Sequence, residues 1–255
     1  MDKIHIISSS NDNYAIHLCV MLNSLLMNKS AHSKIHIWII DGDISPENKN
    51  NIKKVVQKYN TELTYLSVDH KLLDGLEGKQ YKSKDDYYKL YTPQLLNKNI
   101  RKALYLDCDL IVEDDITKLW NNDIDRYYLA AVIQPTTESR KRKLRLPEDS
   151  VLFNTGVMLL NLDKWRKNRI SDKILQFIRN NSAILTTLEQ EAQNVILHKK
   201  WLQLNPKWNY STKLLKVMPH LKPSIIHYTG SKKPWNVGHP LQAYYFKYLK
   251  SIPRD

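Results

Sequence analysis

Residues 101–112 form the stretch that decides the fold class, Arg-Lys-Ala-Leu-Tyr-Leu-Asp-Cys-Asp-Leu-Ile-Val. Its first part, 101–106, has the length and apolar content of a buried strand that ends at Asp107. Carboxylates at i and i+2 just past a strand can lie on one side of the chain and share a hard cation such as Mg²⁺ or Mn²⁺. Burying Asp107 and Asp109 in so apolar a run is costly unless a cation or hydrogen bonds compensate. From these residues alone, a metal site and a structural role are equally well supported.

Around this stretch the chain alternates strand-like and helix-like segments. Short apolar runs between polar turns predict strands, and Ser45-Pro46 is typical of a helix start. Strands alternating with helices favour an α/β fold with a mostly parallel sheet and ligands at the carboxyl ends of its strands. The region after about residue 171 is mostly helical or loop-like. We predict strands at 3–8, 34–40, 61–68, 101–106, 127–134, 156–162, 201–204 and 224–228. We also predict three helices: one with Ile16, Val20, Leu22, Leu25 and Leu26 on one side, one at 46–59, and one at 85–96 despite Pro93.

The composition excludes several classes of protein. With 255 residues and 42% hydrophobic content, the chain can bury a core without disulfides or metal ions to stabilise it. Cys19 and Cys108 are its two cysteines, which excludes a disulfide framework or a zinc cluster and favours a reducing compartment. The first residues have too short an apolar run for a signal peptide, and no stretch of the sequence is long and apolar enough to span a membrane. We therefore expect a cytoplasmic protein.

The net charge of +13 has two interpretations. It indicates either an anionic partner or only a solvated basic surface. The basic segment 138–145 is a candidate acceptor-side or membrane-surface patch, which would place the protein peripherally at the inner face of an anionic membrane. Residues 243–250 could form an amphipathic helix that helps attachment, although packing on the body of the protein is the favoured interpretation.

The Asp-x-Asp spacing occurs three times, so spacing alone identifies no site. Asp123 and Asp125 follow a polar turn, for which a capping role is the better interpretation. Asp41 and Asp43 follow a good strand but lead into Ser45-Pro46, and turn and cap roles explain them. Among the three triplets, only that of Asp107 lies in an apolar run on both sides.

An ordered set of motifs over nearly the whole chain accompanies that pair. In the motifs themselves and in their order along the chain, the sequence resembles the retaining glycosyltransferases of family 8. This is the family of glycogenin and of bacterial lipopolysaccharide galactosyl- and glucosyltransferases. The motifs are Asn11-Asp12-Asn13-Tyr14, Tyr88-Lys89-Leu90, Leu104-Tyr105-Leu106-Asp107-Cys108-Asp109, Phe153-Asn154-Thr155-Gly156-Val157, Asn161-Leu162-Asp163-Lys164-Trp165-Arg166, Glu189-Gln190-Glu191 and His227-Tyr228-Thr229-Gly230-Ser231-Lys232-Lys233-Pro234-Trp235.

The resemblance implies a single Rossmann-like, nucleotide-sugar-binding domain of GT-A type over 1–255. Residues 1–110 would be its nucleotide-binding half, and 111–255 its sugar and acceptor half with a closing C-terminal segment. The implied metal ligands are Asp107, Asp109 and His227, holding Mn²⁺ or alternatively Mg²⁺. Without the aspartate pair and the other motifs, a histidine in an apolar run is more often a hydrogen-bonded residue of the core.

The resemblance also implies donor and catalytic residues. Gly230 and Lys233 match the segment that closes on the diphosphate, and Gln190 lies where the family places a group beneath the anomeric carbon. Glu189 is the nearest carboxylate if a covalent intermediate forms, but it could also face solvent. The implied donor-binding residues are Ser9, Asn11, Asn13, Lys89, Asp107, Cys108, Gln134, Gly230 and Lys233, and the implied catalytic residues are Asn154, Glu189 and Gln190.

Three departures from the family pattern bear on the sugar. Lys89 stands where arginine is usual, so a bidentate contact becomes a point-charge contact. Gln134 replaces an aspartate that commonly contacts the sugar, and Glu189-Gln190-Glu191 replaces Asp-Gln-Asp. The last two departures leave the reaction class unchanged and the sugar open.

The implied reaction is transfer of a hexose, glucose or galactose, from a UDP-sugar to a glycan, glycolipid or glycoprotein hydroxyl with retention of configuration. Two other classes compete with it. A nucleic-acid-binding protein would explain the charge, but no recognised binding module is present and no nucleic-acid partner is expected. A nucleotidyltransferase would share the Asp pair, but it would be expected to carry a glycine-rich phosphate loop near the N-terminus, where residues 8–13 contain no glycine.

Overall fold

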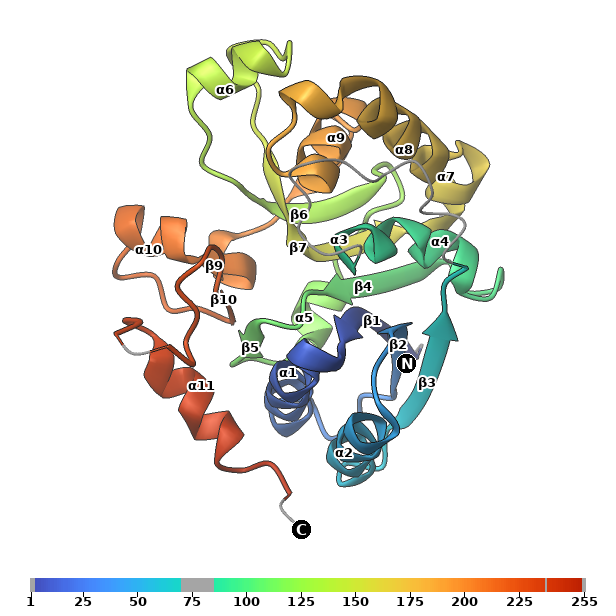
Figure 1. Ribbon diagram of the computed structural model, residues 1–255, viewed down its shortest axis with the longest axis vertical. Helices are drawn as coiled ribbons and strands as arrows, with labels where there is room; N and C mark the ends of the chain where they lie inside the picture. The colour runs from blue at the N-terminus through green and yellow to red at the C-terminus, as the bar shows by residue number, and fades with distance from the viewer. Residues whose placement is uncertain (1–2, 70–84, 237, 254–255) are drawn as a thin grey trace.

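The fold is built on a mixed seven-stranded sheet in the order β3-β2-β1-β4-β7-β6-β8 (Figure 1). This computed structural model describes residues 3–69, 85–236 and 238–253. The pairs β3–β2, β2–β1, β1–β4 and β6–β8 are parallel, whereas β7 is antiparallel to both of its neighbours. The predicted α/β fold with a mostly parallel sheet is confirmed. The strands are β1 (Ile4–Asn11), β2 (Ile35–Gly42), β3 (Glu62–Ser67), β4 (Lys102–Leu106), β6 (Leu129–Ile133), β7 (Phe153–Asn161) and β8 (Trp201–Gln203).

The reversed direction of β7 matters for the site. Leu106 at the end of β4 pairs with Val157 near the start of β7. The N–H of Asp107 then donates to the carbonyl of Gly156 at 2.8 Å. The beginning of β7 therefore lies at the same edge of the sheet as the carboxyl ends of β1 and β4.

Helices cover both faces of the sheet, and the central strands alternate between the two cores. Leu104 and Leu106 of β4 belong to the core beneath α1 and α2, whereas Ala103 and Tyr105 belong to the core beneath α7, α8 and α9. All four side chains are buried, as expected for a strand covered on both faces. The helices are α1 (Ala15–Met27), α2 (Pro46–Gln57), α3 (Asp85–Tyr88), α4 (Thr92–Leu95), α5 (Thr117–Trp120), α6 (Glu138–Lys143), α7 (Leu162–Lys167), α8 (Ile170–Asn181), α9 (Leu188–Ile196), α10 (Thr212–Val217) and α11 (Gln242–Leu249), with 3₁₀ turns η1 (Asp12–Tyr14), η3 (Lys89–Tyr91), η4 (Ser182–Ile184) and η5 (Pro206–Asn209).

A small second sheet of order β5-β10-β9 was not predicted as a sheet. Its strands are β5 (Leu110–Val112), β9 (Tyr210–Ser211) and β10 (Ile225–His227). The strand β5 begins immediately after Asp109 and is antiparallel to β10, with Leu110 opposite His227. This pairing carries His227 from far along the chain to the end of the Asp-x-Asp stretch.

Two details of the helices differ from the prediction. Ile16 is 47% exposed and does not belong to the buried side of α1, because the first turn of that helix buries Ala15 and Leu18 instead. The segment predicted as one helix at 85–96 is α3, η3 and α4 in succession, and Pro93 lies in the first turn of α4, where its missing N–H breaks no hydrogen bond. The predicted cap of α2 is confirmed, since Ser45 accepts from the N–H of Asn48.

The C-terminal helix packs on the protein, as favoured from the sequence. In α11, Tyr245 and Tyr248 are buried in a cluster with Val20 of α1 and Ile111 of β5. Within the described ranges, no helix is both long enough and apolar enough to cross a membrane.

Candidate active site

A cavity of about 480 Å³ opens at the edge of the sheet where β4 ends and β7 begins. Most of the site residues proposed from the sequence line it, although they come from distant segments. Its lining comprises Tyr87, Lys89, Asp107, Asp109, Gln134, Asn154, Thr155, Thr186, Thr187, Leu188, Glu189, Gln190, Thr212, Lys213, Lys216, His227, Thr229, Gly230 and Lys233.

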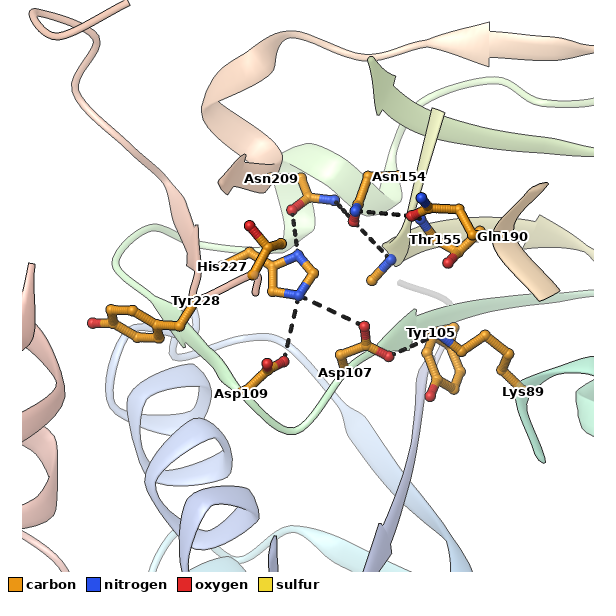
Figure 2. A network of polar contacts seen from close by, with 12 residues as sticks. Lys89, Tyr105, Asp107, Asp109, Asn154, Thr155, Gln190, Asn209, His227 and Tyr228 are labelled. Carbon is orange, nitrogen blue, oxygen red and sulfur yellow. Dashed lines mark hydrogen bonds and ion pairs between the residues drawn. The ribbon is translucent and has the colours of Figure 1, made fainter. Parts of the chain in front are cut away.

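Asp107, Asp109 and His227 converge in this cavity (Figure 2). The Nε2 atom of His227 lies 3.4 Å from an oxygen of Asp109 and 3.7 Å from an oxygen of Asp107. One ligand atom from each residue lies within 4.8 Å of the others. Two carboxylate oxygens and an imidazole nitrogen suit Mn²⁺ and, with less preference for the nitrogen, Mg²⁺. The three residues fit a divalent cation and form a candidate metal site.

Two lysines partly balance the acidic pair. Lys233 contacts Asp109 at 2.5 Å and also donates to the carbonyl of Tyr228 at 2.8 Å. Lys89, only 5% exposed, lies 3.0 Å from Asp107 and 3.3 Å from Glu189. Burial favours the neutral acid of Asp109, but His227 and Lys233 outweigh it and hold the pKa of Asp109 well below its usual range. Asp109 is therefore an anionic ligand throughout the physiological range.

Lys233 lies in a basic run of sequence, but its side chain is largely buried. Its side chain is 16% exposed. Burial disfavours its charged form, but Asp109 outweighs this and raises the pKa of Lys233. A permanent cation therefore lies beside Asp109, where it can meet negative charge on a departing phosphate.

The segment after His227 lines the cavity at one end and contacts α1 at the other. Gly230 has a φ of +87°, which favours glycine, and lines the cavity. Trp235 stacks on His17 of α1 with ring centroids 3.4 Å apart. The segment that the sequence assigns to closure on the diphosphate is thus packed against the N-terminal part of the chain.

The amides of Asn154, Gln190 and Gln134 lie together deeper along the cavity. The amide nitrogen of Asn154 donates to Gln190 at 3.0 Å and to Gln134 at 3.3 Å. The oxygen of Gln190 also accepts from the N–H of Thr155 at 3.2 Å. The oxygens of Gln190 and Gln134 therefore both face the NH₂ group of Asn154, and both side chains line the cavity.

Glu189 lines the cavity and does not face bulk solvent. It is 12% exposed and accepts from the hydroxyl of Thr155 at 3.2 Å and from Gln193 at 3.0 Å, in addition to pairing with Lys89. Its neighbour Glu191 is also buried, at 6% exposure, and forms a close ion pair with Arg140. The basic segment 138–145 is therefore not wholly a free surface patch, because Arg140 anchors α6 to the start of α9.

Four residues of the proposed donor set lie outside the cavity lining. Ser9 and Asn11 are at the carboxyl end of β1, beside β4, where Ser9 contacts the hydroxyl of Tyr105 at 2.9 Å and Asn11 caps η1. Asn13 is exposed in η1. The side chain of Cys108 packs against the core and burial raises its thiol pKa, so any donor contact there would come from its backbone. All four lie at the same sheet edge as the metal ligands, and their donor-binding role stays a prediction.

Sequence reasoning missed two residues that the geometry makes important. Asn209, 1% exposed, contacts Nδ1 of His227 at 2.9 Å. A Cβ on Gly156 would lie 2.2 Å from the His227 ring and 2.7 Å from Asp107, so only glycine leaves room for both ligands. Gly156 stood in a quoted motif, whereas Asn209 in Pro-Lys-Trp-Asn carries no local signal of such a role.

The other two Asp-x-Asp triplets have the structural roles favoured from the sequence. Asp41 accepts from the N–H of Ile44 at 2.8 Å and pairs with Lys49, while Asp43 occupies a left-handed turn position. Asp123 accepts from the N–H of Asp125 at 2.8 Å. Among the described residues, Asp107 and Asp109 are the aspartates that gather a third metal-type ligand.

A mostly parallel α/β sheet with an Asp-x-Asp pair and a histidine at its carboxyl edge defines a GT-A-type glycosyltransferase. The family model described as "Glycosyl transferase family 8" matches residues 5–237, and this chain belongs to that family. Membership implies a nucleotide-sugar donor and a glycan acceptor.

Relatives support the same family. General stress protein A of Bacillus subtilis (strain 168) is 33% identical, covering 96% of this chain and 93% of that protein. Lipopolysaccharide 1,2-glucosyltransferase of Escherichia coli (strain K12) is 27% identical, covering 94% of this chain and 76% of that protein. The crystal structure of the galactosyltransferase LgtC in complex with donor and acceptor sugar analogues matches with a TM-score of 0.90 at 23% identity, covering 99% of this chain and 97% of that one. This last likeness establishes the GT-A fold.

Proposed function

We propose that this protein is a metal-dependent hexosyltransferase that moves glucose or galactose from a UDP-sugar to a hydroxyl of a cell-surface glycan, glycolipid or glycoprotein, with retention of configuration. The observation that carries the proposal is the convergence of Asp107, Asp109 and His227 in a cavity also lined by Lys233 and Gln190. The glucosyltransferase and galactosyltransferase named among its relatives support a hexose donor.

Each half of the chain contributes to the site under this proposal. Residues 1–110 hold the nucleotide, with Ser9, Asn11 and Asn13 meeting the uridine at the end of β1. Residues 111–255 supply His227, the sugar-binding amides and the closing segment with Gly230 and Lys233. Asp107, Asp109 and His227 would hold Mn²⁺, or Mg²⁺ as the alternative, and the bound ion would supply Lewis-acid stabilisation of the leaving diphosphate.

The hydrogen bonds of the cavity favour front-face transfer over double displacement. The oxygen of Gln190 accepts two N–H groups and is therefore a poor nucleophile, and Glu189 is held by Lys89, Thr155 and Gln193. In the front-face route the acceptor oxygen bonds to the anomeric carbon as the bond from that carbon to the phosphate oxygen breaks. The acceptor proton passes to the leaving phosphate, and Lys233 offsets the charge that develops there.

The NH₂ groups of Gln190 and Gln134 would orient the sugar through hydrogen bonds to its hydroxyls, while Asn154 holds both of these side chains through their oxygens. Gln134, where an aspartate is usual, keeps hydrogen bonding to the sugar but loses the charge, so the choice between glucose and galactose stays open. We expect no nucleic-acid partner. Peripheral contact with an anionic membrane from the cytoplasmic side stays a proposal, to which α6 would contribute Arg142 and Lys143, both exposed. Flotation with anionic vesicles at moderate salt tests it, and absence of binding rejects it.

A screen of UDP-sugars with and without Mn²⁺ tests the central proposal. We expect UDP with Mn²⁺ to raise the melting temperature, and one UDP-hexose to be hydrolysed slowly only when the metal is present. Failure of UDP and Mn²⁺ to stabilise the protein would reject it. Single replacements Glu189→Gln and Gln190→Ala, each followed by mass spectrometry, should trap no glycosyl-enzyme if transfer is front-face.

A further inference from the structure

In the hydrogen-bond network behind the metal site, the donor and acceptor of each bond can be assigned, starting from backbone N–H groups of β7 (Figure 2). A backbone N–H can only donate. The N–H of Gly156 lies 2.9 Å from the side-chain oxygen of Asn154, which identifies that atom as the acceptor. The N–H of Thr155 fixes the oxygen of Gln190 in the same way, at 3.2 Å. Two main-chain donors thus orient both amides.

The orientation passes from Asn154 to Asn209. Because the oxygen of Asn154 faces Asn209, the nitrogen of Asn209 must donate to it, at 2.8 Å. The oxygen of Asn209 is then turned toward His227, 2.9 Å from Nδ1. Pairing of β9 with β10 sets Ser211 opposite His227 and thereby holds Asn209 beside the ring.

The last step of this chain decides the state of the imidazole. An oxygen acceptor at Nδ1 requires that Nδ1 carries a proton, so the neutral ring that binds a cation between the two carboxylates presents its lone pair at Nε2. That atom faces Asp109 and Asp107 at 3.4 and 3.7 Å. His227 is 5% exposed and Asn209 1%, so water competes poorly for either contact. The other tautomer would place an N–H toward the cation and leave the oxygen of Asn209 without a donor.

We propose that Asn209 is a positioning residue that locks His227 in the Nδ1–H tautomer and so sets the affinity of the site for its divalent cation. This inference rests on the proposed metal site and adds a residue that neither the motifs nor the cavity lining contain. An asparagine suits the position because it donates to Asn154 and accepts from His227 at once. An aspartate would keep the acceptor for His227 but turn an oxygen toward the oxygen of Asn154.

Replacement of Asn209 tests the role with two readouts besides activity. The first is calorimetric titration of Mn²⁺ in the presence of saturating UDP. The second is the ¹⁵N NMR signature of His227 in protein loaded with UDP and diamagnetic Mg²⁺, which shows whether Nδ1 or Nε2 carries the proton. We expect Asn209→Leu to weaken Mn²⁺ binding by about 10- to 100-fold, as loss of a partner that orients a metal-binding histidine does elsewhere, and to admit the Nε2–H tautomer. Asn209→Asp should retain most of the affinity.

Asn194 offers a matched control. It is another buried asparagine, 3% exposed, and bonds the main chain of Phe153 at 2.7 and 2.9 Å. Asn194→Leu should lower the melting temperature but leave both the tautomer and the Mn²⁺ affinity unchanged. An Nε2–H tautomer in the wild-type protein, or unchanged affinity in Asn209→Leu, would overturn the role of Asn209. Absence of Mn²⁺ binding by the wild-type protein would overturn the metal site itself, and this role with it.

Discussion

Two cavities lie at opposite edges of the central sheet, and the larger one is not the candidate active site. The second cavity, of about 690 Å³, is lined by Lys3 where β1 begins, by Lys102 where β4 begins and by Asn161 where β7 ends. It contains Asp123 and Asp125, with the same spacing as Asp107 and Asp109. Size and spacing therefore fail to distinguish the two edges.

The two edges differ in how deeply their carboxylates are buried and in which residues surround them. At the second cavity the carboxylates meet exposed cations, as in the pair of Asp163 with Arg101, whose side chains are 43% and 82% exposed. Such pairs are screened by water and contribute little. At the first cavity Asp109 is 12% exposed and meets both His227 and Lys233. At the first cavity the pairing of β5 with β10 also brings His227 to the acidic pair, and among the described residues this is the one place where three metal-type ligands gather.

Removing one carboxylate from each cavity should produce the largest contrast. Asp109→Asn removes an anionic metal ligand and should therefore cost several kcal/mol of transition-state stabilisation. We expect kcat/KM for a UDP-hexose to fall about 1000-fold as a result. Asp125→Asn should change kcat/KM by less than about 2-fold, since Asp125 is an exposed turn residue. Comparable losses in both variants would break the distinction between the cavities.

A second contrast compares the lysines of the two cavities. Lys89 is buried between Asp107 and Glu189, so Lys89→Met leaves two carboxylates without that cation and should destabilise the metal-free protein by about 3 kcal/mol. Lys102 donates to the carbonyl of Trp120 at 2.9 Å at the partly exposed edge, and Lys102→Met should cost about 1 kcal/mol or less. Urea unfolding measures both, and equal losses would count against the difference in burial.

Gly156→Ala should have a smaller but more selective effect. The added Cβ would meet the His227 ring at 2.2 Å, so the ring or the strand must shift. We expect a destabilisation of about 1–3 kcal/mol from overpacking and an Mn²⁺ affinity reduced about 10-fold by displacement of the ligand, a smaller change than for Asp109→Asn. Unfolding and Mn²⁺ titration of the same variant provide the check. Normal affinity would show that the site tolerates movement of His227.

The smallest expected effect is a pH dependence that arises from His17, the residue on which Trp235 stacks. Burial lowers the pKa of His17 to about 4, and the ring bonds the hydroxyl of Tyr245 at 2.7 Å. Between pH 6.5 and 4 the unfolded chain binds a proton that folded His17 does not, so stability falls as the pH falls through this window. His17→Phe should reduce that slope in urea unfolding at several pH values. Identical slopes in the two proteins would exclude His17 as a source.

The strands and the acidic pair could be predicted because their signals are local. Apolar runs of strand length gave β1, β2 and β4, and the apolar context of Asp107 separated it from the other triplets. The pairing of β5 with β10 could not be predicted from short segments, because its register depends on contacts between residues far apart in the sequence. Only the family resemblance indicated His227 as a ligand. Asn209 remained hidden because its role depends on the direction of a hydrogen-bond chain.

Because the candidate metal site lies at the small sheet of β5, β10 and β9, cation binding would also affect the stability of the fold. Asp107 and Asp109 lie just before β5, and His227 ends β10, so a cation bound by these three residues would hold the two strands together. A ligand that binds the folded chain and not the unfolded one stabilises it by about 2.7 kcal/mol when its concentration is 100 times its dissociation constant. The supply of divalent cation would then regulate how long the C-terminal segment stays folded, as well as how fast sugar is transferred.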